Sequence, residues 1–262
     1  MDLTGKAILV TGGGGDGVGR GVCEAVVEAG GLLLVNDLTK ERAEAAAARY
    51  DKAVPLPGDV SKPQDVAEIL QSAARHCDHV AGLVNSAGIG LVRRAHEAEE
   101  SDFDRINHTD MRAVWLMSRA FIRQALKARK PGSIVNISSV HAHSTLPGYS
   151  IYAGAKGGVE ALTRGLAVEY GNQDIRCNAV APGYVQSEQN IALLRAWTND
   201  PEAWVERHTK NCQALPYQIA PIDCGRLVVF LLSDQARCVT GQIVRIDCGS
   251  TAMLYDRDFG KA

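Results

Sequence analysis

Short apolar runs alternate along this chain with segments of helical pattern, and this alternation limits the fold more than any other feature. The runs are apolar throughout, as in the stretches LLLVN and VAGLVN, which is typical of parallel strands buried on both faces. They predict strands at residues 6–11, 32–36, 53–56, 80–85, 133–138, 176–181 and 242–247. Helical patterns at 17–29, 38–50 and 63–76 lie between them and suit right-handed crossovers. We therefore predict an α/β fold: one doubly wound parallel sheet of about seven strands with helices on both faces.

A glycine-rich turn, TGGGGDGVG, follows the first predicted strand and precedes a helix. Such glycines let the backbone turn sharply and approach a pyrophosphate, while the helix N-terminus offers free N–H donors. A glycine cluster by itself is equally typical of a loop, but its place between strand and helix favours a Rossmann-like dinucleotide site. The residues predicted to form it are Gly13, Asp16, Gly17, Val18 and Gly19.

Asp37 ends the second predicted strand, 18 residues after Gly19. An acidic side chain there suits the adenosine ribose hydroxyls and repels a 2′-phosphate, which favours NAD over NADP. An aspartate favoured by a helix dipole is the structural alternative. No arginine adjoins Asp37 in the sequence, although Lys40 is near enough to keep NADP as an alternative.

Polar or small residues also follow the third and fourth predicted strands. Asp59 and Val60 follow one, and Asn85, Ala87 and Gly88 follow the other. Ligands bind at the carboxyl ends of strands in such sheets, so these residues join the predicted cofactor site.

Tyr152 and Lys156 stand four residues apart at the start of a helical segment, which places them on one helix face. A phenol with a pKa near ~10 is a poor base at neutral pH, but a nearby cation lowers that pKa. The pair can therefore exchange a proton with a carbonyl or hydroxyl oxygen. Ser138 and Ser139 end the strand before them and supply hydroxyls to hold that oxygen.

In this combination the chain resembles the short-chain dehydrogenase/reductase family over essentially its whole length. The resemblance implies that Ser139 orients the substrate oxygen, Tyr152 transfers the proton, and Lys156 lowers the tyrosine pKa and holds the nicotinamide ribose. Ser139 is preferred to Ser138 because it stands 13 residues before Tyr152. Further residues at the family's nicotinamide positions are Pro182, Gly183, Val185 and Ser187.

The chain departs from the family pattern at three places. The glycine turn holds four residues between Gly12 and Gly17 where the family has three, so either one residue is inserted or Gly13 takes the first role. The position of the family's catalytic asparagine is held by Asp110, with Asn107 one helical turn earlier as the alternative. The family's Asp-Gly-Gly near the C-terminus reads Asp247-Cys248-Gly249.

The predicted function is that of an NAD(H)-dependent oxidoreductase that interconverts a secondary alcohol and a ketone, in one catalytic domain over 1–262. The alternatives are an NADP-dependent ketoreductase and a non-catalytic dinucleotide-binding sensor or structural protein. By resemblance we expect a homo-oligomer, a tetramer or dimer. The sequence leaves the substrate open among steroids, sugars or polyols, and alicyclic or aromatic alcohols.

The segment 184–216 is predicted to cover the substrate and to contain one or two short helices. Tyr149, Tyr184, Trp197 and Trp204 suit an aromatic wall around the substrate, although the two tryptophans equally suit one packed helix face. The pair at 93–94, two arginines, suits either an anionic substrate group or a solvated surface. His141 and His143 suit either a substrate contact or a proton path, but they are interpreted as ordinary loop residues.

Charge and composition argue against other classes of partner. The net charge of −2 gives no reason to expect a nucleic acid or an anionic membrane, and no apolar stretch reaches the ~18 residues of a membrane span. The seven cysteines show no metal-ligand spacing, so no metal is expected. Scattered cysteines and a polar N-terminal stretch predict a cytoplasmic protein with reduced thiols.

Overall fold

The structure, a computed structural model, describes residues 1–195 and 197–259. Its seven strands form one parallel sheet in the order β3-β2-β1-β4-β5-β6-β7. The strands are β1 (Ala7–Thr11), β2 (Leu32–Asp37), β3 (Ala53–Pro57), β4 (Val80–Asn85), β5 (Gly132–Ile137), β6 (Ile175–Pro182) and β7 (Ile243–Ile246). The prediction of a doubly wound parallel sheet is confirmed, because every predicted strand is present with each end within one residue.

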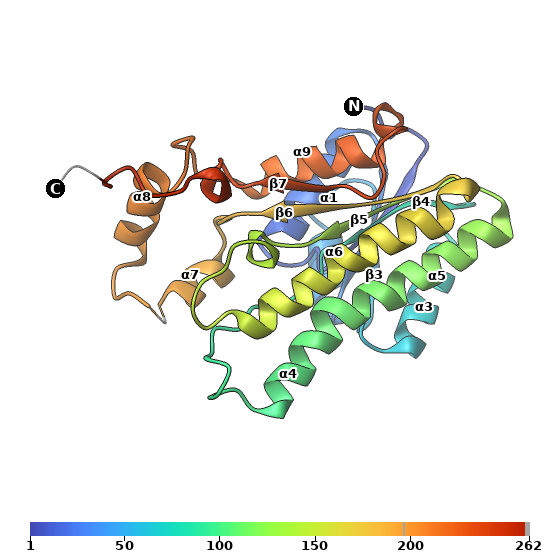
Figure 1. Cartoon of the computed structure of the whole chain (residues 1–262). Helices are drawn as coiled ribbons and strands as arrows, with labels where there is room; N and C mark the ends of the chain where they lie inside the picture. Colours follow the sequence, from blue (N-terminus) through green and yellow to red (C-terminus); the bar gives the residue numbers. More distant parts are fainter. Residues whose placement is uncertain (196, 260–262) are drawn as a thin grey trace.

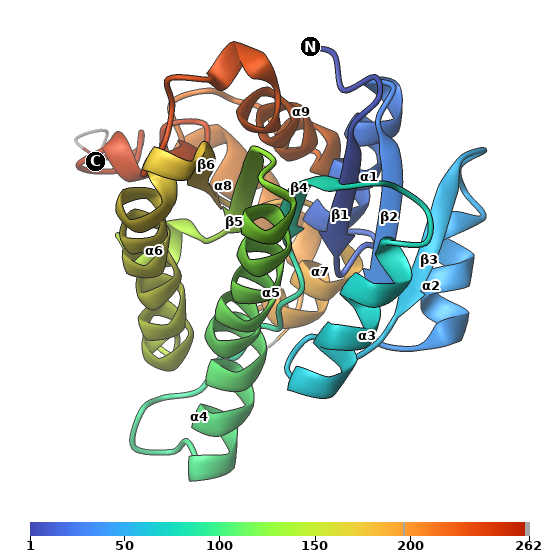
Figure 2. The same ribbon diagram turned by 90° about the vertical axis from the view of Figure 1, so that its right-hand side faces the viewer.

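Helices cover both faces of the sheet (Figure 1). One face packs against α1 (Val18–Glu28), α2 (Lys40–Ala47) and α9 (Pro221–Leu232), and the other against α3 (Pro63–Ala73), α5 (Ala113–Ala128) and α6 (Ser150–Tyr170). Figure 2 shows the same layers from one end of the sheet. Each layer encloses its own core: Val22, Ala47 and Val228 belong to the first, and Ile69 and Phe121 to the second.

Helices α1 and α9 approach each other closely because each carries a glycine at the crossing. A Cβ on Gly21 would lie 2.0 Å from the carbonyl carbon of Pro221, and one on Gly225 would lie 2.1 Å from the carbonyl oxygen of Gly21. No side chain fits at such distances, so the two glycines fix how α9 lies over the sheet.

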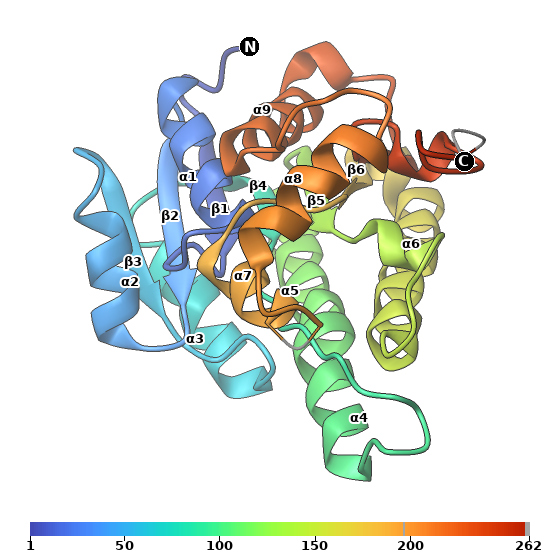
Figure 3. The ribbon, with the colours of Figure 1, turned by 90° about the vertical axis from the view of Figure 1, so that its left-hand side faces the viewer.

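The remaining helices lie at the ends of strands or connect to the main ones. They are α4 (Glu100–Ile106), a π-helical turn (Asn107–Arg112), α7 (Glu188–Leu194), α8 (Pro201–Asn211) and the 3-10 turns Val140–Ala142, Gly171–Gln173, Asp234–Ala236 and Ser250–Ala252. The segment 184–216 thus contains α7 and α8. Both lie in front of the strand ends in Figure 3, where the carboxyl ends of the strands face the viewer.

The sheet changes direction between β1 and β4, which are neighbours. From β1 the chain builds outward to β3 on one side, and from β4 to β7 on the other. In sheets of this kind a crevice opens at this point, outside the carboxyl ends of the strands. Within the described parts of the chain, no helix is both long and apolar enough to cross a membrane.

Candidate active site

A cavity of about 1000 Å³ opens at the carboxyl edge of the sheet. It extends from the glycine turn and the end of β2, past the start of α6, to α7, α8 and the residues after β7. Its size lies within the range of small-molecule and cofactor sites. Ser139, Tyr152, Lys156 and Asp110 all line it, so the fold brings the four predicted catalytic residues together.

Lys156 lies one helical turn after Tyr152 on α6, and its Nζ is 5.5 Å from the centre of the tyrosine ring. The ammonium donates a hydrogen bond to the Ile137 carbonyl oxygen at 3.1 Å, which holds it at the end of β5. Ser139 Oγ accepts a hydrogen bond from the backbone N–H of His141 at 3.2 Å. Because that oxygen is held as an acceptor, its own hydrogen is free to donate to another oxygen in the cavity.

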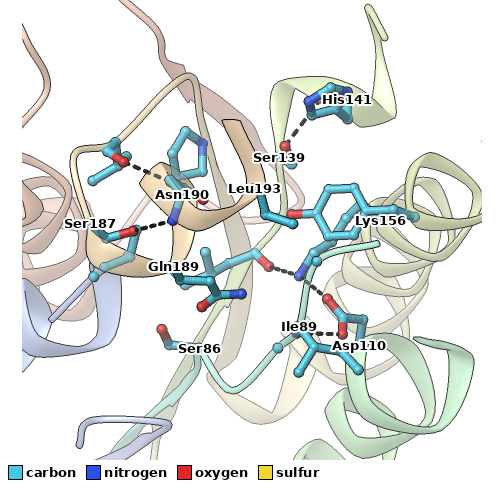
Figure 4. Close-up of a pocket in the computed structure, with 18 of the residues that line it drawn as sticks. Ser86, Ile89, Asp110, Ser139, His141, Lys156, Ser187, Gln189, Asn190 and Leu193 are labelled. Atoms are coloured by element: carbon cyan, nitrogen blue, oxygen red, sulfur yellow. Dashed lines mark hydrogen bonds and ion pairs between the residues drawn. The ribbon is translucent and has the colours of Figure 1, made fainter. Parts of the chain in front are cut away.

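Asp110 lies in the π-helical turn between α4 and α5 and is completely buried. Its Oδ2 is 3.1 Å from Lys156 Nζ, and its Oδ1 accepts a hydrogen bond from the Ile89 N–H at 2.9 Å (Figure 4). Gly88 leaves room for this carboxylate, since a Cβ there would lie 2.9 Å from Oδ2. Asn107, the alternative at this position, instead donates to the Phe103 carbonyl oxygen.

The charges of this cluster shift one another's proton affinity. Burial raises the pKa of the Tyr152 phenol, Lys156 opposes this, and Asp110 adds to it, so the pKa lies above its ordinary value. A hydrogen bond with Ser139 lowers it in part. For Lys156, burial lowers the pKa, but Asp110 and Tyr152 outweigh burial and raise it. The lysine therefore stays charged beside Asp110.

The glycine turn is one residue longer than the family pattern, and Gly12 rather than Gly13 makes its sharp bend. Gly12 has a φ of 69°, and a Cβ on it would lie 2.7 Å from Ala87 Cα. Gly13 was predicted to bind the cofactor, but it packs beneath the turn against Val35 and Cys23 and does not line the cavity. Gly19 packs on the carbonyl of Gly12, where a Cβ would meet the oxygen at 2.3 Å.

Asp37 is buried at the end of β2 and lines the same part of the cavity. Its Oδ2 accepts a hydrogen bond from the Gly14 N–H at 2.8 Å, and its Oδ1 accepts one from Leu38 N at 2.9 Å. Arg42 Nε lies 2.7 Å from Oδ1. The sequence shows no arginine next to Asp37, but the first turn of α2 brings Arg42 onto it.

The cofactor end of the cavity fits a dinucleotide. Gly12 and Gly19 let the backbone of the turn pack tightly on its neighbours, since a Cβ on either would clash with main-chain atoms. Gly15 and Gly17, at the N-terminus of α1, line the cavity and leave room for a pyrophosphate. Asp37 uses about three of its roughly four lone-pair positions, which leaves one for a ribose hydroxyl. The following residues, predicted to bind the cofactor, also line the cavity: Asp16, Gly17, Val18, Asp59, Val60, Ala87, Gly88, Pro182, Gly183, Val185 and Ser187.

Three predicted cofactor residues have contacts that the sequence did not indicate. Asn85 does not line the cavity; its amide donates to Asn136 and Ser118 inside the sheet layer. Asp59 accepts hydrogen bonds from the N–H and hydroxyl of Ser61. Asp16 Oδ2 accepts a hydrogen bond from the Glu188 N–H at 2.5 Å, which ties the glycine turn to the start of α7.

The other end of the cavity carries aromatic rings from both walls. Tyr149 stacks on His141 at 4.1 Å and meets Trp197 edge-on at 5.4 Å. Trp197 follows α7 and lies 6.4 Å from Trp204 on α8, so the two tryptophans do not share one helix face but both line the cavity. Arg93, expected either at a substrate or at the surface, pairs with Asp102 at 2.7 Å outside the cavity.

Some cavity residues were not named individually from the sequence. Gln189, Leu193, His208 and Cys212 belong to the segment 184–216 that was predicted to cover the substrate, whereas Asn36, Arg42, Thr251 and Met253 were missed. No motif marks them, because they reach the cavity through the fold alone. Cys248 has a φ of 51°, which explains why the family favours glycine at this position. Within the described ranges, no group of three or more His, Cys, Asp or Glu side chains is placed to hold a metal ion.

Comparisons with known proteins agree with this arrangement. A family model described as enoyl-(acyl carrier protein) reductase matches residues 13–251. A 2-(S)-hydroxypropyl-CoM dehydrogenase from Xanthobacter autotrophicus is 34% identical over 259 residues, covering 96% of this chain and 98% of that protein. A hydroxynaphthalene reductase-like protein from Metarhizium robertsii is 32% identical over 262 residues, covering 95% and 96%.

Solved structures show the same fold. A chain from Agrobacterium tumefaciens assigned as a gluconate dehydrogenase superposes with a TM-score of 0.88 at 28% identity, over 97% of this chain and 98% of that one. A short-chain alcohol dehydrogenase assigned in Sinorhizobium meliloti gives 0.87 at 30% identity, over 97% and 99%. The family match, the relatives and the parallel sheet together identify this chain as a member of the short-chain dehydrogenase/reductase family, whose enzymes are oxidoreductases with a nicotinamide dinucleotide cofactor.

Proposed function

We propose that this protein is an NAD(H)-dependent dehydrogenase that interconverts a secondary alcohol and a ketone, with Tyr152 as the acid/base. The observation that carries the proposal is the meeting of Ser139, Tyr152 and Lys156 in one cavity whose other end holds the buried carboxylate of Asp37. The relatives named as a dehydrogenase and as a reductase-like protein support the same reaction class.

In the oxidative direction, Ser139 donates a hydrogen bond to the substrate oxygen and Tyr152 accepts its proton. Bound NAD⁺ supplies the acceptor for the hydride of the carbinol carbon. The balance is alcohol plus NAD⁺ to ketone, NADH and one proton. Lys156 stabilises the phenolate by its charge, and Asp110 together with the Ile137 carbonyl holds the lysine in place. In the reductive direction Tyr152 returns the proton to the developing alkoxide.

Asp37 supports NAD over NADP. Its buried carboxylate would repel a 2′-phosphate, and one lone-pair position remains for a ribose hydroxyl. Arg42 is the observation in favour of the second candidate, an NADP-dependent ketoreductase, because a guanidinium pairs well with phosphate. In this structure, however, the Arg42 guanidinium already forms an ion pair with Asp37, which competes with binding of a phosphate. The roles of the individual cofactor residues, the homo-oligomeric state and the cytoplasmic location stay predictions.

Titration with NADH and NADPH, followed by nicotinamide fluorescence in the wild type and in Asp37→Ala, tests the cofactor. We expect NADH to bind more tightly than NADPH in the wild type, and to bind about 10- to 100-fold more weakly in the variant, as for a lost hydrogen bond to a charged group. Equal affinities in the wild type would support the ketoreductase. Failure to bind either nucleotide would overturn the proposal.

Replacing Tyr152 with phenylalanine tests catalysis separately from binding. The variant keeps the ring, so NADH should bind as in the wild type while the rate of ketone reduction falls about 10²- to 10⁴-fold. Bound NADH with no turnover in the wild type across secondary alcohols and ketones would instead support the non-catalytic alternative.

A further inference from the structure

The substrate end of the cavity is a nearly continuous set of rings. We call the aromatic end the group formed by His141, Tyr149, Tyr184, Trp197, Trp204 and His208. Its ring contacts start beside Tyr152, which lies 5.9 Å from Tyr149. They cross to the covering segment through Trp197 and end where Trp204 stacks on His208 at 5.0 Å. Rings therefore reach from the proposed acid/base to the far wall.

The aromatic end carries no formal charge. None of the described cavity-lining residues from 139 to 152, or from 184 to 253, is an aspartate, glutamate, lysine or arginine. Burial lowers the pKa of His141 to about 4 and also lowers the pKa of His208, so both rings are neutral at physiological pH. A charged group placed here would lose its hydration and find no partner of opposite charge, which strongly disfavours its binding.

The charged residues of the cavity lie elsewhere or are already paired. Asp16, Asp37, Arg42 and Asp59 belong to the cofactor end, and Lys156 pairs with Asp110. Arg105, on α4, lies 3.5 Å from Asp102. An anionic substrate would therefore meet no free cation among the described residues of the aromatic end.

We infer that the substrate is an uncharged, flat ring compound that carries its secondary hydroxyl or ketone on or next to the ring. The inference rests on the proposed function, since it places the reacting oxygen between Ser139 and Tyr152. A rigid ring placed in the cavity against Tyr149 and the tryptophans gains edge-on and offset ring contacts in addition to its buried apolar area. A flexible chain gains only its buried area and loses rotational freedom on binding.

Reduction of matched ketones by NADH tests charge and shape separately. Acetophenone and 4-acetylbenzoate differ only in a carboxylate, and 2-tetralone and 2-octanone contrast a rigid fused ring with a chain. We expect kcat/KM to be at least about 100-fold higher for acetophenone than for 4-acetylbenzoate. Desolvating the unpaired carboxylate costs more free energy than a 100-fold ratio in kcat/KM represents. It should be about 10-fold higher for 2-tetralone than for 2-octanone.

Trp204→Leu tests whether the rings set this preference, because leucine keeps an apolar side chain without the ring. Its kcat/KM for 2-tetralone should fall about 10-fold, while that for 2-octanone changes less than about threefold. Trp115→Leu is the matched control: this tryptophan is 43% exposed on α5 and does not line the cavity. Equal losses for both ketones in Trp204→Leu, or equal rates for acetophenone and 4-acetylbenzoate, would overturn the inference.

A binding experiment separates failure of the inference from failure of the proposed function. Calorimetric titration of the protein, saturated with NAD⁺, with 2-naphthol and with naphthalene-2-sulfonate does not require turnover. Binding of the neutral ring alone, weakened in Trp204→Leu, supports the inference even if Tyr152→Phe leaves the rate of reduction unchanged and the catalytic proposal fails. Equal binding of the sulfonate, or no binding of either ring, contradicts the inference whatever the catalytic result.

Discussion

Asp110 Oδ2 lies 3.1 Å from Lys156 Nζ, and both side chains are almost entirely shielded from solvent. Where the family has a neutral asparagine, this chain therefore places a negative charge beside the lysine that acts on Tyr152. Lys156 lowers the pKa of Tyr152 and Asp110 raises it, so the aspartate offsets part of the lysine's effect.

Asp110→Asn should shift the pH dependence of alcohol oxidation to lower pH. In the proposed reaction, oxidation needs the deprotonated phenol, so its rate should rise with pH through the pKa of Tyr152. Removing the charge of Asp110 removes a cause that raises that pKa, and the rise begins earlier. The measurement is kcat/KM for alcohol oxidation against pH. Asp104→Asn, an exposed carboxylate on α4, is the control, and a shift of Asp110→Asn to higher pH would contradict the explanation.

Arg42 should become a phosphate ligand once Asp37 is removed. In Asp37→Ala the guanidinium loses its partner at 2.7 Å and is free to bind a 2′-phosphate. We expect NADPH to bind Asp37→Ala about 10- to 100-fold more tightly than it binds Asp37→Ala/Arg42→Ala, as for a hydrogen bond to a charged group. The readout is the Kd of each variant for NADPH. Equal values in the two variants would show that Arg42 has no part in cofactor choice.

Asp16→Ala should weaken substrate binding through the covering segment. The variant removes the acceptor of the Glu188 N–H, the hydrogen bond that joins the glycine turn to α7. Loss of a partly exposed hydrogen bond of this kind should raise KM for the alcohol about 3- to 10-fold with a smaller change in kcat. Asp16→Asn keeps an acceptor and should restore most of the wild-type KM. If both variants behave alike, charge rather than the bond to α7 is responsible.

Asn136→Ala should destabilise the sheet rather than the site. The Asn136 side chain is fully buried, accepts from Asn85 at 2.8 Å and donates to Thr163 at 2.9 Å. Its loss leaves the Asn85 amide with one partner fewer, at a cost of about 1–3 kcal/mol in the free energy of unfolding. Urea unfolding measures this, with Gln64→Ala on the exposed face of α3 as control. An unchanged midpoint would mean that the network adds nothing to stability.

The fold could be predicted because its strands are apolar on both faces, and such runs stand out against the helical segments between them. Tyr152 and Lys156 could be predicted because their spacing alone puts them on one helix face. Arg42 and Met253 could not, since each reaches the cavity through the packing of an element that carries no motif. The glycine turn shows the same limit. The sequence left Gly12 and Gly13 as alternatives for the first glycine of the family pattern, and only their backbone conformation and neighbouring atoms show which one makes the sharp bend.

The π-helical turn at Asn107–Arg112 determines where Asp110 lies relative to Lys156. A π turn accommodates one extra residue in an otherwise α-helical rod, and each residue of an α-helix turns its side chain by about 100°. Deleting a single residue N-terminal to Asp110 within α4 would let the rod return to a regular helix and keep the register of α5. Deleting one after Asp110 would instead swing its carboxylate away from Lys156. The charge environment of Lys156 thus depends on the one extra residue that the π turn accommodates in a neighbouring helix. An insertion or deletion there changes this environment without replacing any residue that lines the cavity.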